Sequence, residues 1–151
     1  MPMKLTEQDA RESLGDHVAR KGSDIFARYG PDIGWQELQL IINDPEFVRY
    51  PCTIEFDDEP LQEGECAYPL PISSRPEDGY TMVVHPYFLN RLEFVPHVVF
   101  YQLVAINYGD FAGSVDAEKF GSSALGIPVD EYYHKLCTLS DSIGDAHTPA
   151  D

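Results

Sequence analysis

Long apolar segments are absent from this chain of 151 residues. No stretch approaches the roughly 20 apolar residues that a membrane-spanning helix requires. The N-terminus also lacks the apolar region of a secretory signal. We therefore expect a cytoplasmic protein without a membrane partner.

Cysteine is scarce as well. The chain has three cysteines, Cys52, Cys66 and Cys137, and none of them forms a CxxC pair. An odd and sparse set argues against a disulfide framework and against a zinc knuckle. We interpret these residues as reduced thiols that serve as small apolar side chains.

Basic residues are few, with 10 Lys and Arg against 26 Asp and Glu, and the formal net charge is −16. A surface of this sign repels phosphate backbones, so we expect no nucleic-acid partner. The acids concentrate between residues 55 and 65, where no Lys or Arg intervenes and where the order differs from that of a calcium loop. This charge favours solubility, and it also suits a basic protein partner.

The familiar catalytic and nucleotide-binding motifs are missing too. The chain contains no GxGxxG, no phosphate-binding loop and no GxSxG elbow. It does contain 43% hydrophobic and 12% aromatic residues, enough for one well-formed core. We expect a single domain over residues 1–144 and a flexible tail over residues 145–151.

Apolar periodicity predicts helices on both sides of a group of strands. In the first third, a helix capped by Thr6 is expected to end near Gly22, with further helices over 23–30 and 35–43. Alternating residues predict strands over 52–56, 65–70 and 80–85, the second of them at a sheet edge because of its prolines.

The last third of the chain returns to helical spacing. Helices are expected over 96–109, over 114–126 with Ser114 as the cap, and over 130–140. Helices, then a small and mostly antiparallel sheet, then helices again define the α+β class.

The helix over 96–109 carries the sequence Tyr101-Gln102-Leu103-Val104-Ala105. It resembles the active-site helix of zincins, the zinc peptidases whose motif is His-Glu-x-x-His. In that motif the histidines one turn apart bind a single zinc ion, and the glutamate acts as general base. Tyr101 and Ala105 stand at the histidine positions, and Gln102 stands at the glutamate position.

The resemblance extends over about residues 50–128. The segment 116–128 is similar to the following helix of small zinc peptidase-like domains found in anti-repressor proteases, where an acid completes the metal site. Asp116 is its counterpart in this chain. The strand 80–85 resembles the edge strand that lies along a zincin cleft and pairs with extended peptide. The resemblance thus implies a zincin-like α+β fold with a cleft at Tyr101, Gln102, Ala105 and Asp116.

The zinc ligands themselves are not present. Alanine has no donor atom, and glutamine cannot replace a carboxylate base. We therefore predict no catalytic residues, no cofactor and no zinc peptidase activity at these positions. The alternative interpretation of this segment is an ordinary buried amphipathic helix.

A relocated metal site is a second interpretation. His97 lies one turn before Tyr101, and His85 ends the preceding strand, so both could join Asp116 or Glu118 in a His-carboxylate cluster. Otherwise His97 is a residue of the first helical turn, and His85 belongs to the turn that ends the strand.

Three functions follow as hypotheses. The first is a non-catalytic binding or regulatory module whose cleft holds an extended peptide, by strand addition, or a small ligand. The second is a metal-dependent hydrolase that uses the relocated cluster. The third is an acidic interaction protein whose contact surface, residues 55–65, meets a basic partner.

Overall fold

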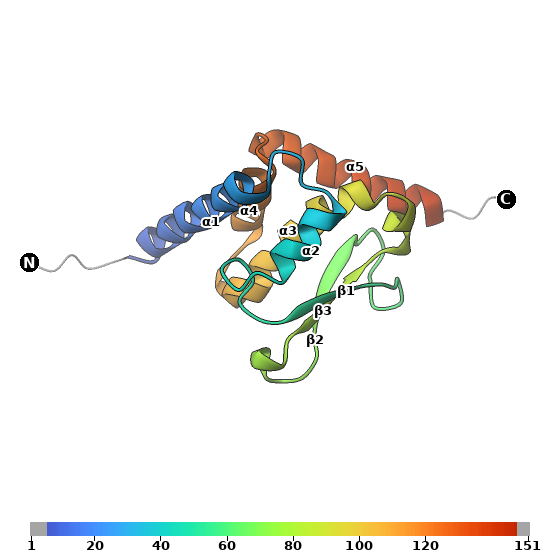
Figure 1. The fold of residues 1–151 in the computed structure, drawn as a ribbon, viewed down its shortest axis with the longest axis horizontal. Coiled ribbons are helices and arrows are strands. Elements are labelled where there is room, and N and C mark those ends of the chain that lie inside the picture. The colour runs from blue at the N-terminus through green and yellow to red at the C-terminus, as the bar shows by residue number, and fades with distance from the viewer. Residues whose placement is uncertain (1–5, 148–151) are drawn as a thin grey trace, which may run out of the picture.

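The computed structural model describes residues 6–147, and it confirms the α+β class. Helices precede and follow a small sheet, as predicted (Figure 1). The elements are α1 (Glu7–Tyr29), α2 (Trp35–Ile42), β1 (Cys52–Phe56), β2 (Ala67–Pro71), β3 (Tyr80–Val84), α3 (Val95–Tyr108), α4 (Ser114–Leu125) and α5 (Val129–His147).

Helix α1 begins as predicted and ends later than predicted. Thr6 caps it reciprocally with Asp9: the Asp9 N–H donates to Thr6 Oγ1 over 3.0 Å, and the Thr6 N–H donates to Asp9 Oδ2 over 3.1 Å. The expected stop at Gly22 is wrong, because the helix continues to Tyr29. Gly22 is instead buried against α4, where it allows the two helices to approach closely.

The three-stranded sheet has the order β1-β3-β2, with β1 parallel and β2 antiparallel to β3. It is therefore mixed rather than mostly antiparallel. The expectation that the 80–85 strand is an edge strand is also wrong, because β3 lies in the centre. Its consecutive buried residues Met82, Val83 and Val84 are typical of a strand that is covered on both faces.

Strand β2 is an edge strand, as its prolines predicted. The His85 N–H donates to the Cys66 carbonyl over 2.9 Å, and the Ile72 N–H donates to the Gly79 carbonyl over 3.0 Å. These bonds set the alternation of the antiparallel ladder, so the nitrogens of Pro69 and Pro71 face the open edge. The free edge of β2 consequently lacks two of its N–H donors.

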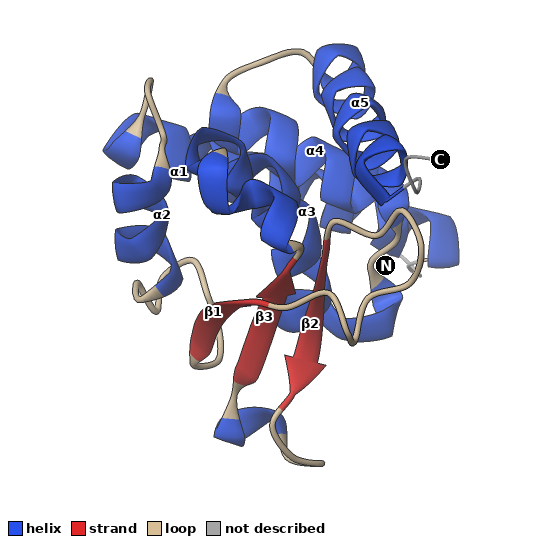
Figure 2. Cartoon of the chain, turned by 90° about the vertical axis from the view of Figure 1, so that its right-hand side faces the viewer, coloured by secondary structure: helices blue, strands red, loops and turns tan. Residues whose placement is uncertain are grey.

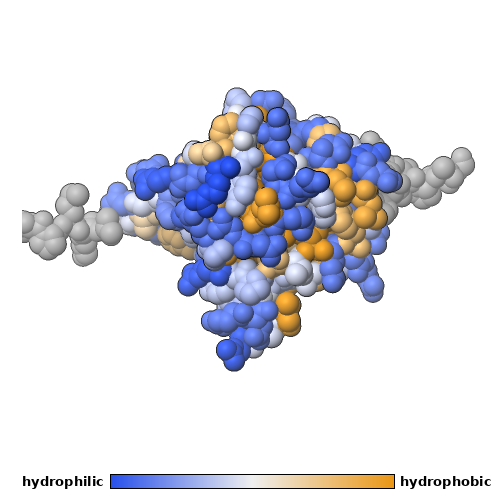
Figure 3. Space-filling model, viewed as in Figure 1, coloured by the Kyte–Doolittle hydropathy of each residue, from blue (hydrophilic) through white to orange (hydrophobic). Residues whose placement is uncertain are grey.

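The core lies between one face of the sheet and the helices, which Figure 2 shows above and behind the strands. Helix α3 is central and contributes many buried residues to this core, among them Val99, Phe100 and Leu103, which are fully inaccessible. The face of the molecule in Figure 3 is mostly hydrophilic, with apolar side chains scattered over it. No helix in the described part of the chain is long and apolar enough to cross a membrane.

The C-terminal helices differ in detail from the prediction. The cap of α4 is Gly113 rather than Ser114, and the Gly113 N–H donates to Asp116 Oδ2 over 3.0 Å. Helix α5 extends to His147 instead of ending near residue 140. Residues 145–147 of the expected tail are therefore helical, and residues 148–151 lie outside the described part.

Candidate functional site

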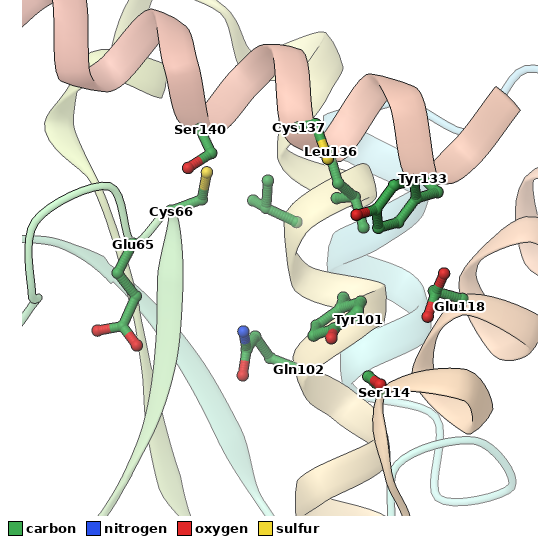
Figure 4. A pocket seen from close by; sticks show the side chains of 11 residues that line it. Glu65, Cys66, Tyr101, Gln102, Ser114, Glu118, Tyr133, Leu136, Cys137 and Ser140 are labelled. Atoms are coloured by element: carbon green, nitrogen blue, oxygen red, sulfur yellow. The ribbon is translucent and has the colours of Figure 1, made fainter. Parts of the chain in front are cut away.

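A cavity of about 370 Å³ opens between α3, α5, the first turns of α4 and the segment that leads into β2 (Figure 4). Its walls combine apolar side chains with hydroxyl, amide, thiol and carboxylate groups. The lining residues are Glu65, Cys66, Val98, Tyr101, Gln102, Ser114, Glu118, Tyr133, Leu136, Cys137 and Ser140. We call this cavity the main pocket.

Two helical faces build most of the main pocket. Val98, Tyr101 and Gln102 of α3 follow the i, i+3, i+4 spacing that places side chains on one face of a helix. The facing wall comes from α5, where Tyr133, Leu136, Cys137 and Ser140 recur at i, i+3, i+4 and i+7. This second stripe was readable in the sequence, but it was not predicted to form a pocket wall.

The acidic connection between β1 and β2 is fastened to the α5 wall. The Ser140 hydroxyl donates to the Gly64 carbonyl over 2.6 Å. Next to Gly64, the Gln62 N–H donates to Glu65 Oε1 over 3.1 Å. These bonds hold Glu65 and Cys66 at the rim of the main pocket (Figure 4).

Three of the four predicted cleft residues lie together. Tyr101 and Gln102 line the main pocket, and both also line an adjoining cavity of about 200 Å³ together with Ala105. Asp116 lines neither cavity, because its carboxylate accepts the N–H of Gly113 and caps α4. A sequence position that resembled a metal ligand is thus occupied by a capping residue.

The structure does not bring together the residues proposed for a relocated metal site. Glu118 lines the main pocket, whereas His85 and His97 line two other cavities. His85 Nδ1 accepts the N–H of Tyr87 over 3.0 Å and so caps the turn after β3. In the part of the chain that the structure describes, no three His, Cys, Asp or Glu side chains form a group that can hold a metal ion.

The zincin-like positions do not fit a zinc ion either. Zinc requires nitrogen, sulfur or carboxylate donors in a tetrahedral set. Tyr101, Gln102 and Ala105 supply no imidazole and no carboxylate, and Asp116 is engaged in its helix cap. These residues therefore supply no ligand set for zinc-dependent hydrolysis.

Tyr101 and Cys66 of the main pocket are protonated donors rather than nucleophiles. Burial, together with Glu118 and Tyr133, raises the pKa of Tyr101. Burial, assisted by Glu65, raises the pKa of the Cys66 thiol to about 12. A thiol with so high a pKa stays neutral near pH 7, and the neutral form is a poor nucleophile. The pocket therefore offers hydrogen bonds and apolar contact.

The fold and the site together define a small α+β protein with a helix-lined pocket. Comparison with protein-family models, with curated protein sequences and with solved structures finds no match. The resemblance to zincins accordingly stays a prediction that rests on residues 50–128.

Proposed function

We propose that the chain is a non-catalytic binding or regulatory module whose main pocket takes a peptide group or a small ligand. The main support for this proposal is the pocket itself. Its lining residues on α3 and α5, and the rim at Cys66, present polar groups around an apolar floor. Pockets of this volume and mixed lining are typical of ligand sites. A zincin-like ancestry of the α3 helix is part of the same proposal.

Strand addition is not a part of this proposal. The strand expected to pair with a peptide, β3, already has a partner on each side. The edge nearer the pocket, β2, carries Pro69 and Pro71 with their nitrogens toward the open side. Recognition through side chains in the pocket replaces recognition through the backbone.

A hydrolase with a relocated metal site gains no support, because His85, His97 and Glu118 line three different cavities. Two measurements test this alternative directly. Elemental analysis of the purified protein is expected to find no stoichiometric metal, and mass spectrometry is expected to find no cleavage of a mixed peptide library. Stoichiometric zinc that is lost in a His97→Asn variant would overturn the non-catalytic proposal.

Plugging the pocket tests the binding role. Ser114 is exposed and lines the main pocket, whereas its neighbour Val115 is exposed and does not. We expect a mixture of small polar aromatic fragments to shift the ¹⁵N–¹H resonances of residues 98–102 and 133–140. Ser114→Trp should abolish these shifts by filling the pocket, and Val115→Trp should preserve them. Equal shifts in both variants would contradict the proposal.

A further inference from the structure

Carboxylates flank the main pocket on two sides. Glu118 stands on the α4 side and Glu65 on the β2 side (Figure 4). No Lys, Arg or His lines this pocket. Among the residues that the structure describes, neither carboxylate belongs to an ion pair.

The lysines closest in sequence to this wall are directed elsewhere. Lys119 follows Glu118 on α4, but its Nζ lies over Gly15 of α1. Lys135 lies on α5, but its Nζ is 4.0 Å from the centroid of the Phe94 ring, beside a different cavity. Glu118 therefore keeps its charge available for a cation from outside, whereas one oxygen of Glu65 also accepts the N–H of Gln62.

The rest of the lining suits a flat cation. Tyr101 and Tyr133 stand on the Glu118 side of the pocket (Figure 4), and both contribute polarisable rings and hydroxyl groups. A guanidinium is planar, so it can lie flat on such a ring and can pair with a carboxylate through two parallel N–H groups. An ammonium also binds rings and carboxylates, but only as a point charge. The chain itself uses this contact elsewhere, where the Arg91 guanidinium carbon lies 3.9 Å from the centroid of the Tyr87 ring.

The surroundings favour a segment of protein over an isolated amine. The acidic residues of the β1–β2 connection lead from Glu55, on β1, directly to Glu65 at the rim of the pocket. Glu55, Asp57, Glu59 and Glu63 are exposed along this path. The negative charge of this segment and the net charge of −16 attract the basic residues that flank a seated side chain.

We propose that the main pocket receives the arginine side chain of a basic protein segment, with Glu118 as the charge partner, Tyr101 and Tyr133 as stacking surfaces, and Glu65 as a second carboxylate at the rim. This inference rests on the proposed binding function and names its ligand class. It also gives the acidic segment 55–65 a role: this segment attracts the basic residues on either side of the arginine, while the arginine itself enters the main pocket.

A peptide titration followed by ¹⁵N–¹H NMR tests the inference. The probe is an acetylated and amidated Gly-Lys-Arg-Lys-Gly peptide, compared with the same peptide carrying citrulline in place of arginine and with spermidine as a free polyamine. We expect the arginine peptide to shift residues 98–102 and 133–140. Replacement of arginine by citrulline removes the charge-assisted bonds and should weaken binding about tenfold or more.

Two variants that each remove one negative charge test whether Glu118 contacts the arginine. Glu118→Gln should weaken binding of the arginine peptide about tenfold, because it removes a charged hydrogen-bond partner. Glu131→Gln removes the same charge from an exposed position of α5 that lines another cavity, and it should change affinity less than about twofold. Equal effects of the two variants would reduce the interaction to diffuse attraction and overturn the inference.

Other outcomes separate this inference from the function on which it rests. If the citrulline peptide binds the pocket as tightly, or if spermidine binds it as tightly as the arginine peptide, arginine recognition is overturned while the binding role survives. If no peptide shifts these residues and the fragment mixture also fails to do so, both proposals are overturned.

Discussion

Helices α1 and α4 pack much more closely against each other than helices α3 and α5 do beside the main pocket. Along α1, Gly22 lies so near α4 that an added Cβ would be 2.6 Å from the Phe120 carbonyl oxygen and 2.7 Å from Ser123 Cβ. Between α3 and α5, in contrast, a cavity of about 370 Å³ remains. One small domain thus contains both a close-packed helix seam and an open one.

The difference indicates which contacts maintain the fold. Interiors pack to nearly crystalline density, so a gap of this volume loses dispersion energy that a closed seam keeps. The lining of the gap mixes aliphatic side chains with polar and aromatic ones, among them Tyr101, Gln102 and Glu118. We interpret the α1–α4 seam as the structural side of the domain and the α3–α5 gap as its binding side.

The largest expected effect lies in the close-packed seam. Gly22→Ala should lower the free energy of unfolding by about 3 kcal/mol, since the atoms that its Cβ meets include backbone that cannot rotate away. The gain in helix propensity of about 1 kcal/mol from replacing glycine offsets only part of the overpacking. Urea denaturation monitored by circular dichroism measures the loss.

Gly15 provides the matched control on the same helix. An added Cβ there meets Lys119 Nζ at 2.9 Å, which is the end of a flexible side chain. Gly15→Ala should therefore stabilise the protein by up to about 1 kcal/mol through helix propensity. Similar destabilisation at both positions would remove the special role of Gly22 and weaken the comparison.

At the first turn of α3, beyond the main pocket, α3 and α5 also pack closely, and His97 is held there without a counter-charge. The His97 ring is stacked 6.3 Å from the Tyr132 ring, and the Tyr132 hydroxyl donates to the His97 carbonyl over 2.6 Å. His97 Nδ1 has no hydrogen-bond partner among the described residues. Burial, reinforced by the charge of Lys135, lowers the pKa of His97 to about 4.

This shift predicts a loss of stability in acid. The pKa of His97 in the folded protein is below its unfolded value. The contribution of the neutral ring to the free energy of unfolding is therefore complete above pH 6.5, and it is lost as the pH falls from about 6.5 to about 4. At pH 5 the wild type should have lost about 2 kcal/mol more than His97→Phe, each relative to its own value at pH 7.5. Urea midpoints at the two pH values provide the measurement. His134→Asn, at an exposed position, is the control and should follow the wild type, and an unchanged slope in His97→Phe would disprove the assignment.

Local patterns were sufficient for most elements of the fold. The helix cap at Thr6, the alternation in β1 and the apolar stripe of α3 each depend on neighbours in the chain, and each was predicted close to its observed bounds. Gly22 was misassigned as a helix end because its reason for being glycine lies on α4, about 100 residues away in the chain. The central place of β3 likewise depends on pairing that no local pattern contains.

The site was predicted only in part. Tyr101 and Gln102 were assigned to it through the resemblance of their helix to the zincin helix, and both line the main pocket. Asp116 was assigned to the cleft through the same resemblance. An acid near a helix start can serve as a ligand or as a cap, and the bond to Gly113 distinguishes the two. The α5 wall was missed because its stripe became a pocket wall only when α5 folded against α3.

The smallest expected effect belongs to the open seam. Gln102 lines the main pocket, and its side chain makes no hydrogen bond with another residue in the described part of the structure. Gln102→Ala should change the free energy of unfolding by less than about 0.5 kcal/mol, because alanine suits a helix and no buried partner is lost.

The adjacent residue supplies the contrast in the same helix. Leu103 is fully buried, so Leu103→Ala should cost about 3 kcal/mol in the same urea titration. A cost for Gln102→Ala near that of Leu103→Ala would show that the pocket lining maintains the fold, and the division into a structural side and a binding side would then fail. A negligible cost, together with weaker binding of the arginine peptide, would mean that this amide serves recognition, since it does not serve stability.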